Sequence, residues 1–116
     1  MEKTKTNAVK NIYLVSRPEV DDVHAVGYDE WDSFIVVASS EEAARTTFPR
    51  GIDGNTVWCP RRKNWFWDLQ VEDPNARPES RSGWITDLHT LKVVLVGMAD
   101  PSLPEGKVLC ASFNAG

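Results

Sequence analysis

The chain alternates between short apolar runs and polar stretches that contain proline, and this pattern predicts several short β-strands. A strand is predicted at residues 11–16, and its residues 12–15 are apolar without interruption, which is typical of a strand covered on both faces. Pro18 ends this strand, because proline cannot donate a hydrogen bond to a sheet ladder. A shorter strand candidate at residues 24–28 stops near Gly27. The same pattern predicts three further strands, at residues 33–38, 91–96 and 107–113.

One helix is predicted directly after the strand at 33–38. Ser39 is a suitable N-cap, and Glu42 lies three residues further on, at the spacing of a capping box. Pro49 ends the helix after about two to three turns. Ala44 and Phe48 are four residues apart, so we expect both to face the sheet.

A tryptophan-rich hairpin is predicted in the middle of the chain. Its arms are residues 56–59 and 65–71, where apolar and polar side chains alternate, and its tip is the basic stretch 60–64. Residues 72–83 are polar and carry two prolines, which predicts a loop.

The order of these elements predicts an α+β fold. It is a mostly antiparallel sheet with one short helix after an early strand and a Trp-rich hairpin insertion. Gly97 is expected to end the strand at 91–96. Short connections on both sides of Pro101 favour antiparallel pairing of the last two strands. The length suits a single domain over residues 1–116, with a flexible tail at residues 1–10.

The charge balance bears on possible partners. Lys and Arg number 13 and Asp and Glu number 17, which gives a net charge of −4. Proteins that coat DNA or RNA are usually basic, so long nucleic acid is disfavoured as a partner. A small anionic ligand stays compatible, because a few local arginines can override a weak global field.

Cysteine usage and hydropathy indicate a protein of the cytosol. Cys59 and Cys110 are too few for a disulfide scaffold, and we expect both to be reduced and buried. No apolar run approaches the ~18 residues of a membrane span, and the polar N-terminus lacks the apolar stretch of a secretory signal.

The sequence offers no strong catalytic or metal-binding motif. His24, His89 and the two cysteines are scattered, whereas zinc needs three or four ligands at suitable spacing. There is no nucleophile elbow and no glycine-rich loop to hold a phosphate. Asp29 and Asp32 could form a carboxylate pair, but a polar turn is the simpler interpretation. We therefore expect no enzymatic activity, no metal and no cofactor.

The aromatic residues are more informative. Rings that stack on a base, with cations that pair with phosphates, are the two components of nucleotide binding. A subunit interface, where Trp and Arg are also enriched, and a stacked sugar are the alternatives. The five tryptophans are Trp31, Trp58, Trp65, Trp67 and Trp84.

Several segments together carry a resemblance to a known family. They are Tyr28-Asp29-x-Trp31-Asp32-Ser33, the strand at 35–38, Glu42-Ala43-Ala44-Arg45 with Pro49, then Trp84, Gly97-x-Ala99 and the terminal Ser112-Phe113-Asn114-Ala115-Gly116. In this order they resemble a family of small phage proteins that includes the first-described Thoeris anti-defence proteins. The family often has His where this chain has Phe48, and the Trp-rich hairpin is an elaboration of the family pattern.

The resemblance implies a sponge that acts in the host cytoplasm. Such proteins bind and sequester the signal of a bacterial immune system without cleaving it. The signal is a cyclic ADP-ribose isomer of the glyco-cyclic type, and some members also bind cyclic oligonucleotides. The resemblance also implies homo-oligomers, with dimers that assemble into hexamers.

On this hypothesis aromatic rings stack on the base and arginines pair with the phosphates. Asp100 and Asn114 accept hydrogen bonds from ribose hydroxyls or from the base edge. The expected ligand-binding residues are Tyr28, Trp31, Arg45, Arg50, Trp84, Asp100, Phe113 and Asn114.

Two other hypotheses stay open. The first is a phage accessory factor that binds a protein through the Trp/Arg-rich hairpin and takes no nucleotide. The second is a small hydrolase that uses Asp29 or Asp32.

Overall fold

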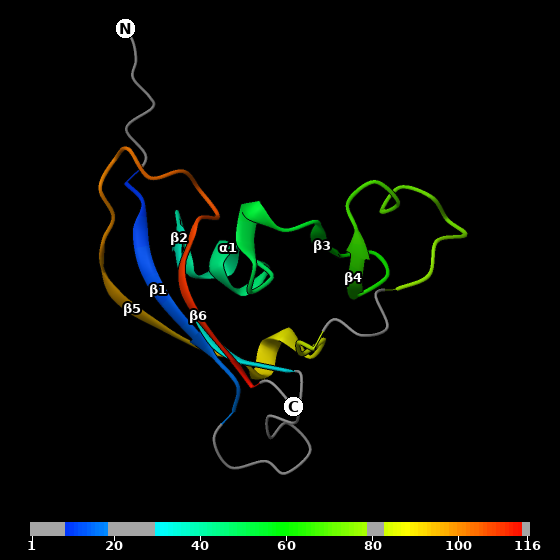
Figure 1. The fold of residues 1–116 in the computed structure, drawn as a ribbon, viewed down its shortest axis with the longest axis horizontal. Coiled ribbons are helices and arrows are strands. Elements are labelled where there is room, and N and C mark those ends of the chain that lie inside the picture. The colour runs from blue at the N-terminus through cyan, green and yellow to red at the C-terminus, as the bar shows by residue number, and fades with distance from the viewer. Residues whose placement is uncertain (1–8, 19–29, 79–82, 115–116) are drawn as a thin grey trace, which may run out of the picture.

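The computed structural model describes residues 9–18, 30–78 and 83–114. The elements in chain order are β1 (Asn11–Ser16), β2 (Glu30–Ala38), α1 (Glu41–Arg45), the 3₁₀ turn η3 (Gly51–Asp53), β3 (Thr56–Cys59), β4 (Asn64–Trp67), the 3₁₀ turn η4 (Leu88–Thr90), β5 (Lys92–Met98) and β6 (Val108–Asn114). In Figure 1 the main sheet lies at one end, the β3–β4 hairpin lies at the other, and α1 lies between them. The predicted α+β class is confirmed.

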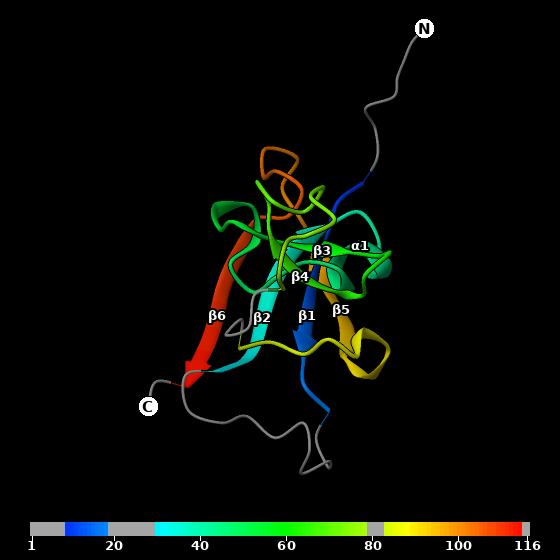
Figure 2. The same ribbon diagram turned by 90° about the vertical axis from the view of Figure 1, so that its right-hand side faces the viewer.

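The main sheet has four strands in the order β5-β1-β2-β6, and every neighbouring pair is antiparallel. Figure 2 shows the four strands side by side in this order. The prediction that the last two strands pair with each other is wrong, because β5 pairs with β1 and β6 pairs with β2. Residues 99–107 between them are long enough to cross three strand spacings, roughly 14 Å. Lys10 and Val37 hold this connection by accepting hydrogen bonds from Ala99 N (2.9 Å) and Gly106 N (2.8 Å).

One face of the sheet carries the core. Tyr13 and Val15 point into it from β1, and their cross-strand partners Val36 and Phe34 are buried beside them. Leu14, on the opposite face, is half-buried. The run at 12–15 therefore has one buried face in this chain and not the two that its composition predicted.

Helix α1 is shorter than predicted. Its N-cap is Ser40 and not Ser39: the Ser40 Oγ accepts a hydrogen bond from Ala43 N at 3.1 Å. The helix ends because Thr47 N donates to the Ala44 carbonyl at 3.2 Å, and the Thr47 hydroxyl donates to the Ala43 carbonyl at 2.7 Å in place of a backbone N–H. The prediction that Ala44 and Phe48 face the sheet is confirmed, since both are buried in the core.

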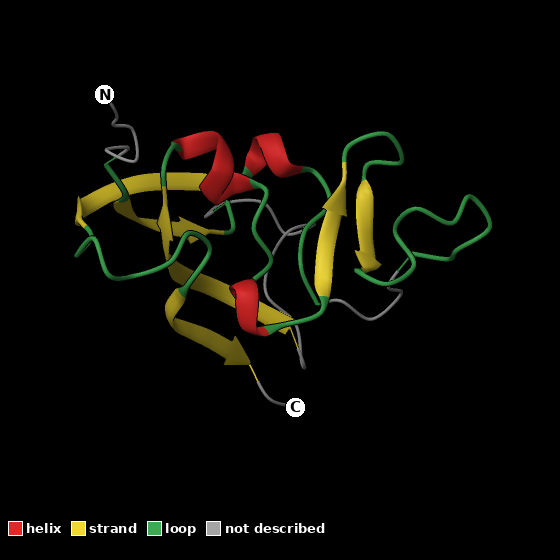
Figure 3. Cartoon of the chain, turned by 90° about the horizontal axis from the view of Figure 1, so that it is seen from above, coloured by secondary structure: helices red, strands yellow, loops and turns green. Residues whose placement is uncertain are grey.

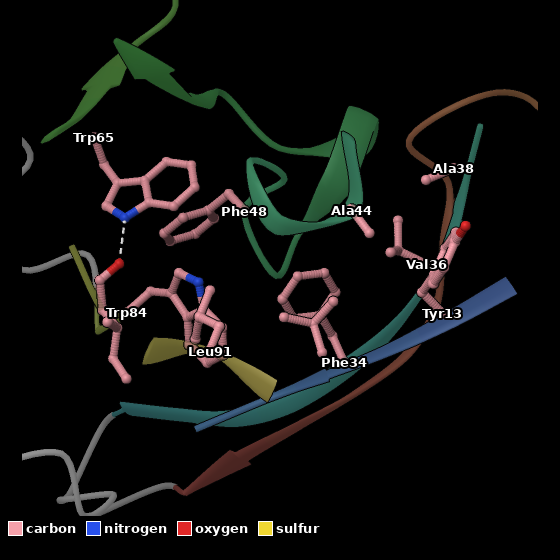
Figure 4. Close-up of a cluster of buried hydrophobic side chains, with 11 residues drawn as sticks. Tyr13, Phe34, Val36, Ala38, Ala44, Phe48, Trp65, Trp84 and Leu91 are labelled. Atoms are coloured by element: carbon pink, nitrogen blue, oxygen red, sulfur yellow. Dashed lines mark hydrogen bonds between the residues drawn. The ribbon is translucent and has the colours of Figure 1, made fainter. Parts of the chain in front are cut away.

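The hairpin packs on the core through the fully buried Trp65 and the half-buried Trp58. Trp65 is fully buried and its Nε1 donates to the Ile85 carbonyl at 2.9 Å, as Figure 4 shows. Its ring makes edge contacts with Phe48 and Trp58, at centroid distances of 5.2 and 5.0 Å. Seen from above in Figure 3, the hairpin extends beyond the helical layer on the side away from the sheet.

Three details of the sequence prediction need correction. The second hairpin arm ends at Trp67, and Trp65 and Phe66 do not alternate in exposure, because each is buried in its own apolar cluster. Gly97 lies inside β5, which continues to Met98. Cys59 is buried as expected, but Cys110 is exposed, because it lies on the edge strand β6. The strand candidate at 24–28 lies outside the described residues.

Candidate functional site

Three of the residues predicted for a ligand site meet at the end of the β2–β6 pair. Trp31 and Phe113 are cross-strand partners, and their ring centroids lie 4.7 Å apart at an interplanar angle of 62°. The guanidinium carbon of Arg50 lies 5.8 Å from the centroid of the Trp31 ring. Phe113 is 45% exposed, Arg50 is exposed and Trp31 is half-buried. We call these three residues the Trp31 cluster.

The backbone of Trp31 is fixed from two sides. Its N–H donates to the Gly83 carbonyl at 2.9 Å, and its carbonyl accepts from Arg17 Nε at 2.6 Å. The register between β2 and β6 shifts between Trp31 and Ser33. This bulge adds one residue to β2, which aligns Trp31 with Phe113.

Arg50 reaches the cluster from the turn that follows Pro49. Gly51, the next residue, has φ +61°, where a side chain is strained. A Cβ at this position would also collide with the Gly106 carbonyl oxygen. Gly51 therefore sets the turn directly against the start of β6 and fixes the point from which Arg50 extends.

Arg17 supports the cluster from inside the protein. Its guanidinium donates to the carbonyls of Trp31 and Gly83 and lies 3.6 Å from the Glu30 carboxylate. Burial lowers the pKa of Arg17, and the negative charges of Glu30 and Asp32 oppose that shift. Arg17 is not among the residues predicted for the site. Tyr13 and Val15 are buried at every second position of β1, and Arg17 lies two residues further on. The same alternation therefore predicts that the Arg17 side chain points toward the core.

Arg45, which was expected to pair with phosphate, is engaged within the fold. Its NH1 donates to the carbonyls of Leu88 and Leu91, both at 2.8 Å, and its NH2 contacts Glu41 at 2.8 Å. These bonds join α1 to the segment that leads into β5. The arrangement gives Arg45 a structural role.

Trp84 is also a core residue. It is 6% exposed and its ring contacts Phe34 at a centroid distance of 5.4 Å (Figure 4). Stacking of a ligand on this ring would require the core to open, so the structure separates Trp84 from the exposed Trp31 cluster.

Three predicted residues remain, and they are Asp100, Asn114 and Tyr28. Asp100 is exposed on the β5–β6 connection, where its Oδ1 accepts from Ser102 N at 2.8 Å. Hydrogen bonds from Ser102, first from its side chain and then from its backbone, lower the pKa of Asp100. Asn114 follows Phe113 and its backbone pairs with Glu30. Tyr28 lies outside the described residues.

A groove of about 530 Å³ forms a second feature, between the hairpin and the turns around α1 and β6. It contains none of the eight predicted residues. Its lining includes Phe48, Ile52, Trp58, Asp68 and Glu105. The sequence drew attention to Trp58 through the hairpin, but nothing in the sequence placed the two carboxylates beside it.

The basic residues of the hairpin are only partly available to a partner. Arg62 donates to the Ala76 carbonyl at 2.8 Å, and its guanidinium carbon lies 4.5 Å from the centroid of Phe66, so it stabilises the hairpin. Trp67 and Leu69 are 40% and 76% exposed. These two exposed apolar side chains lie at the end of β4 and two residues beyond it.

Within the described ranges, no three His, Cys, Asp or Glu side chains lie close enough together to hold a metal ion. No helix in that part of the chain is long and apolar enough to cross a membrane. Comparison with family models, curated proteins and solved structures finds no match for this chain.

Proposed function

We propose that this protein binds and sequesters a cyclic nucleotide signal without cleaving it, as its resemblance to the Thoeris anti-defence family implies. The expected ligand is a cyclic ADP-ribose isomer of the glyco-cyclic type, with cyclic oligonucleotides as a further class. The observation that supports this most is the Trp31 cluster, in which an exposed arginine and an exposed aromatic ring both lie against the half-buried Trp31 ring.

Arg50 differs from the other arginines near the core. Arg17, Arg45 and Arg62 donate to main-chain carbonyls. Arg50 makes no hydrogen bond or ion pair with any described residue, and its interaction there is with the Trp31 ring. Its five donors are therefore available to a phosphate, which a guanidinium can bind in a bidentate manner.

Phe113 supplies the complementary part of the proposed site. Base stacking on an exposed aromatic ring contributes roughly 1–3 kcal/mol per base. Trp31 supports the Phe113 ring by an edge contact and keeps it in place on β6. Capture of this kind needs no general base, nucleophile or metal, so a role without turnover is compatible with these residues.

We further propose that the protein forms homo-oligomers, dimers that assemble into hexamers. Strand β5 lies at one edge of the sheet and carries exposed apolar side chains on an open backbone ladder: Val94, Leu95, Val96 and Met98. An exposed apolar edge strand pairs readily with another chain.

A thermal-shift titration with cyclic ADP-ribose isomers and cyclic oligonucleotides tests the proposal. A ligand at about 100 times its Kd stabilises the folded protein by about 2.7 kcal/mol, which gives a clear rise in Tm. Denaturing the complex should then release the ligand intact. Release of a cleaved product would indicate a hydrolase, with Asp29 or Asp32 as the candidate acid or base.

The exposed Trp67 and Leu69 favour one other candidate function, in which the hairpin binds a protein partner. This alternative predicts no change in Tm with any nucleotide. It also predicts that replacing both residues by serine abolishes the partner's binding and leaves the fold intact.

A further inference from the structure

We propose that the groove beside Trp58 is a separate binding site for a small organic cation with an aromatic or apolar body. The proposal goes beyond the nucleotide-binding function and does not depend on it. It rests on the shape of the groove, the charges in its lining and the orientation of its hydroxyl groups.

The groove has a rigid aromatic wall. Trp58 is half-buried, and its ring is held by an edge contact of 5.0 Å between its centroid and that of the fully buried Trp65. Phe48 and Ile52 add apolar surface. A volume of about 530 Å³ lies within the range of roughly 300–1,000 Å³ that is usual for small-molecule sites.

The charges of the lining have one sign. Asp68 and Glu105 line the groove, and no Lys or Arg side chain does so in the part of the chain that is described. Glu105 is held in place because its Oε2 accepts from Ser39 N at 3.0 Å. Lys107, which follows the lining residue Gly106, is paired with Asp53 at 2.9 Å. The local field therefore attracts a cation and repels a phosphate.

Two of the three threonine hydroxyls in the lining point to the same chemistry. Thr47 Oγ1 donates its proton to the Ala43 carbonyl at 2.7 Å, and Thr46 Oγ1 donates to the Glu42 carbonyl at 3.1 Å. A hydroxyl whose proton is already donated can only accept from a ligand. The groove thus offers acceptors beside an aromatic face, which suits an ammonium or guanidinium group and its attached ring or chain.

Isothermal titration calorimetry with two isosteric probes of opposite charge tests this site. Tryptamine carries an ammonium on an indole, and indole-3-propionate carries a carboxylate on the same indole. We expect tryptamine to bind with millimolar or lower Kd and indole-3-propionate to show no heat of binding. Equal binding of both probes, or no binding of tryptamine, would overturn the proposal.

Variants locate the binding. Asp68→Asn removes a carboxylate from an exposed position and should weaken tryptamine binding about two- to fivefold, which is the scale of an exposed ion pair. Glu105→Gln should act in the same direction. Asp73→Asn is the matched control, because Asp73 lies outside the lining and Asn can still accept from Asn75 N. Unchanged tryptamine binding in Asp68→Asn and Glu105→Gln would refute the site. Tryptamine binding is measured without any nucleotide, and none of the groove-lining residues belongs to the Trp31 cluster, so failure of the nucleotide proposal and failure of this one are distinguishable.

Discussion

Arg17 Nε lies 2.6 Å from the Trp31 carbonyl oxygen, so a buried guanidinium holds the strand residue on which the exposed cluster is built. We predict that Arg17→Lys lowers the free energy of unfolding by about 1–3 kcal/mol, because an ammonium cannot satisfy the carbonyls of both Trp31 and Gly83 in the same geometry. Urea denaturation measures this. Arg61→Lys, at an exposed position, should change stability by less than ~0.5 kcal/mol. Equal effects of the two substitutions would contradict the role given to Arg17.

Trp65 provides a second test, because it joins the hairpin to the core. Trp65→Phe removes the hydrogen bond to the Ile85 carbonyl and leaves a cavity, and we expect it to cost about 2 kcal/mol or more. The matched substitution Trp67→Phe lies on the exposed side of the same strand and should cost much less. Thermal or urea unfolding of both variants measures the difference. A larger loss for Trp67→Phe would show that the hairpin packs through its other face.

Gly51 and Gly97 form a matched pair of glycines. Gly51→Ala places a Cβ against the Gly106 carbonyl oxygen at φ +61°, and we expect a loss of about 1–2 kcal/mol with a displaced Arg50. Gly97→Ala meets no atom within 4 Å and should be close to neutral. Differential scanning calorimetry compares the two. If Gly51→Ala is tolerated as well as Gly97→Ala, the close contact between that turn and β6 does not exist in solution.

Asp100 should titrate below its ordinary pKa of 3.8, because Ser102 donates to its ionised form. A lowered folded pKa means that this interaction stabilises the fold at pH values above 3.8 and is lost as the pH falls through the folded value. NMR titration of the Asp100 carboxyl group measures the pKa directly. Ser102→Ala should raise it toward 3.8. No rise in that variant would assign the shift to another cause.

The β5 edge makes self-association testable. Leu95→Lys places a charge on this exposed edge and should weaken or abolish the oligomer in sedimentation velocity experiments, because charged side chains block edge pairing. Leu69→Lys, on the hairpin, is the control and should leave the assembly intact. A monomeric wild-type protein, or an oligomer unaffected by Leu95→Lys, would remove β5 from the interface.

The sequence was sufficient to place the sheet and the helix but not to pair all the strands. Apolar periodicity located β1, β2, β5 and β6 to within a few residues, since alternation is a local property of the chain. Pairing depends on where a connection leads, and the β5–β6 connection crosses the sheet, whereas a short hairpin would have paired the two strands. The observed N-cap, Ser40, lies one residue after the predicted Ser39. Both serines are suitable caps, and the backbone N–H of Ser39 donates to Glu105.

Residue type alone could not separate exposed arginines and tryptophans from structural ones. Arg45 and Arg50 look equivalent in sequence, yet Arg45 donates to Leu88 and Leu91 while Arg50 extends over Trp31. Trp84 looks like Trp31 but lies in the core. These differences arise from long-range contacts, which no local pattern encodes.

The most direct test of the proposed function is the Kd of the cyclic ADP-ribose isomer measured by calorimetry for wild type, Arg50→Ala and Arg61→Ala. Arg50→Ala should raise the Kd about tenfold or more, because it removes a charge-assisted contact to phosphate. Arg61→Ala should bind as wild type does. Wild-type affinity in Arg50→Ala, or no binding by the wild-type protein, would contradict a nucleotide site at the Trp31 cluster.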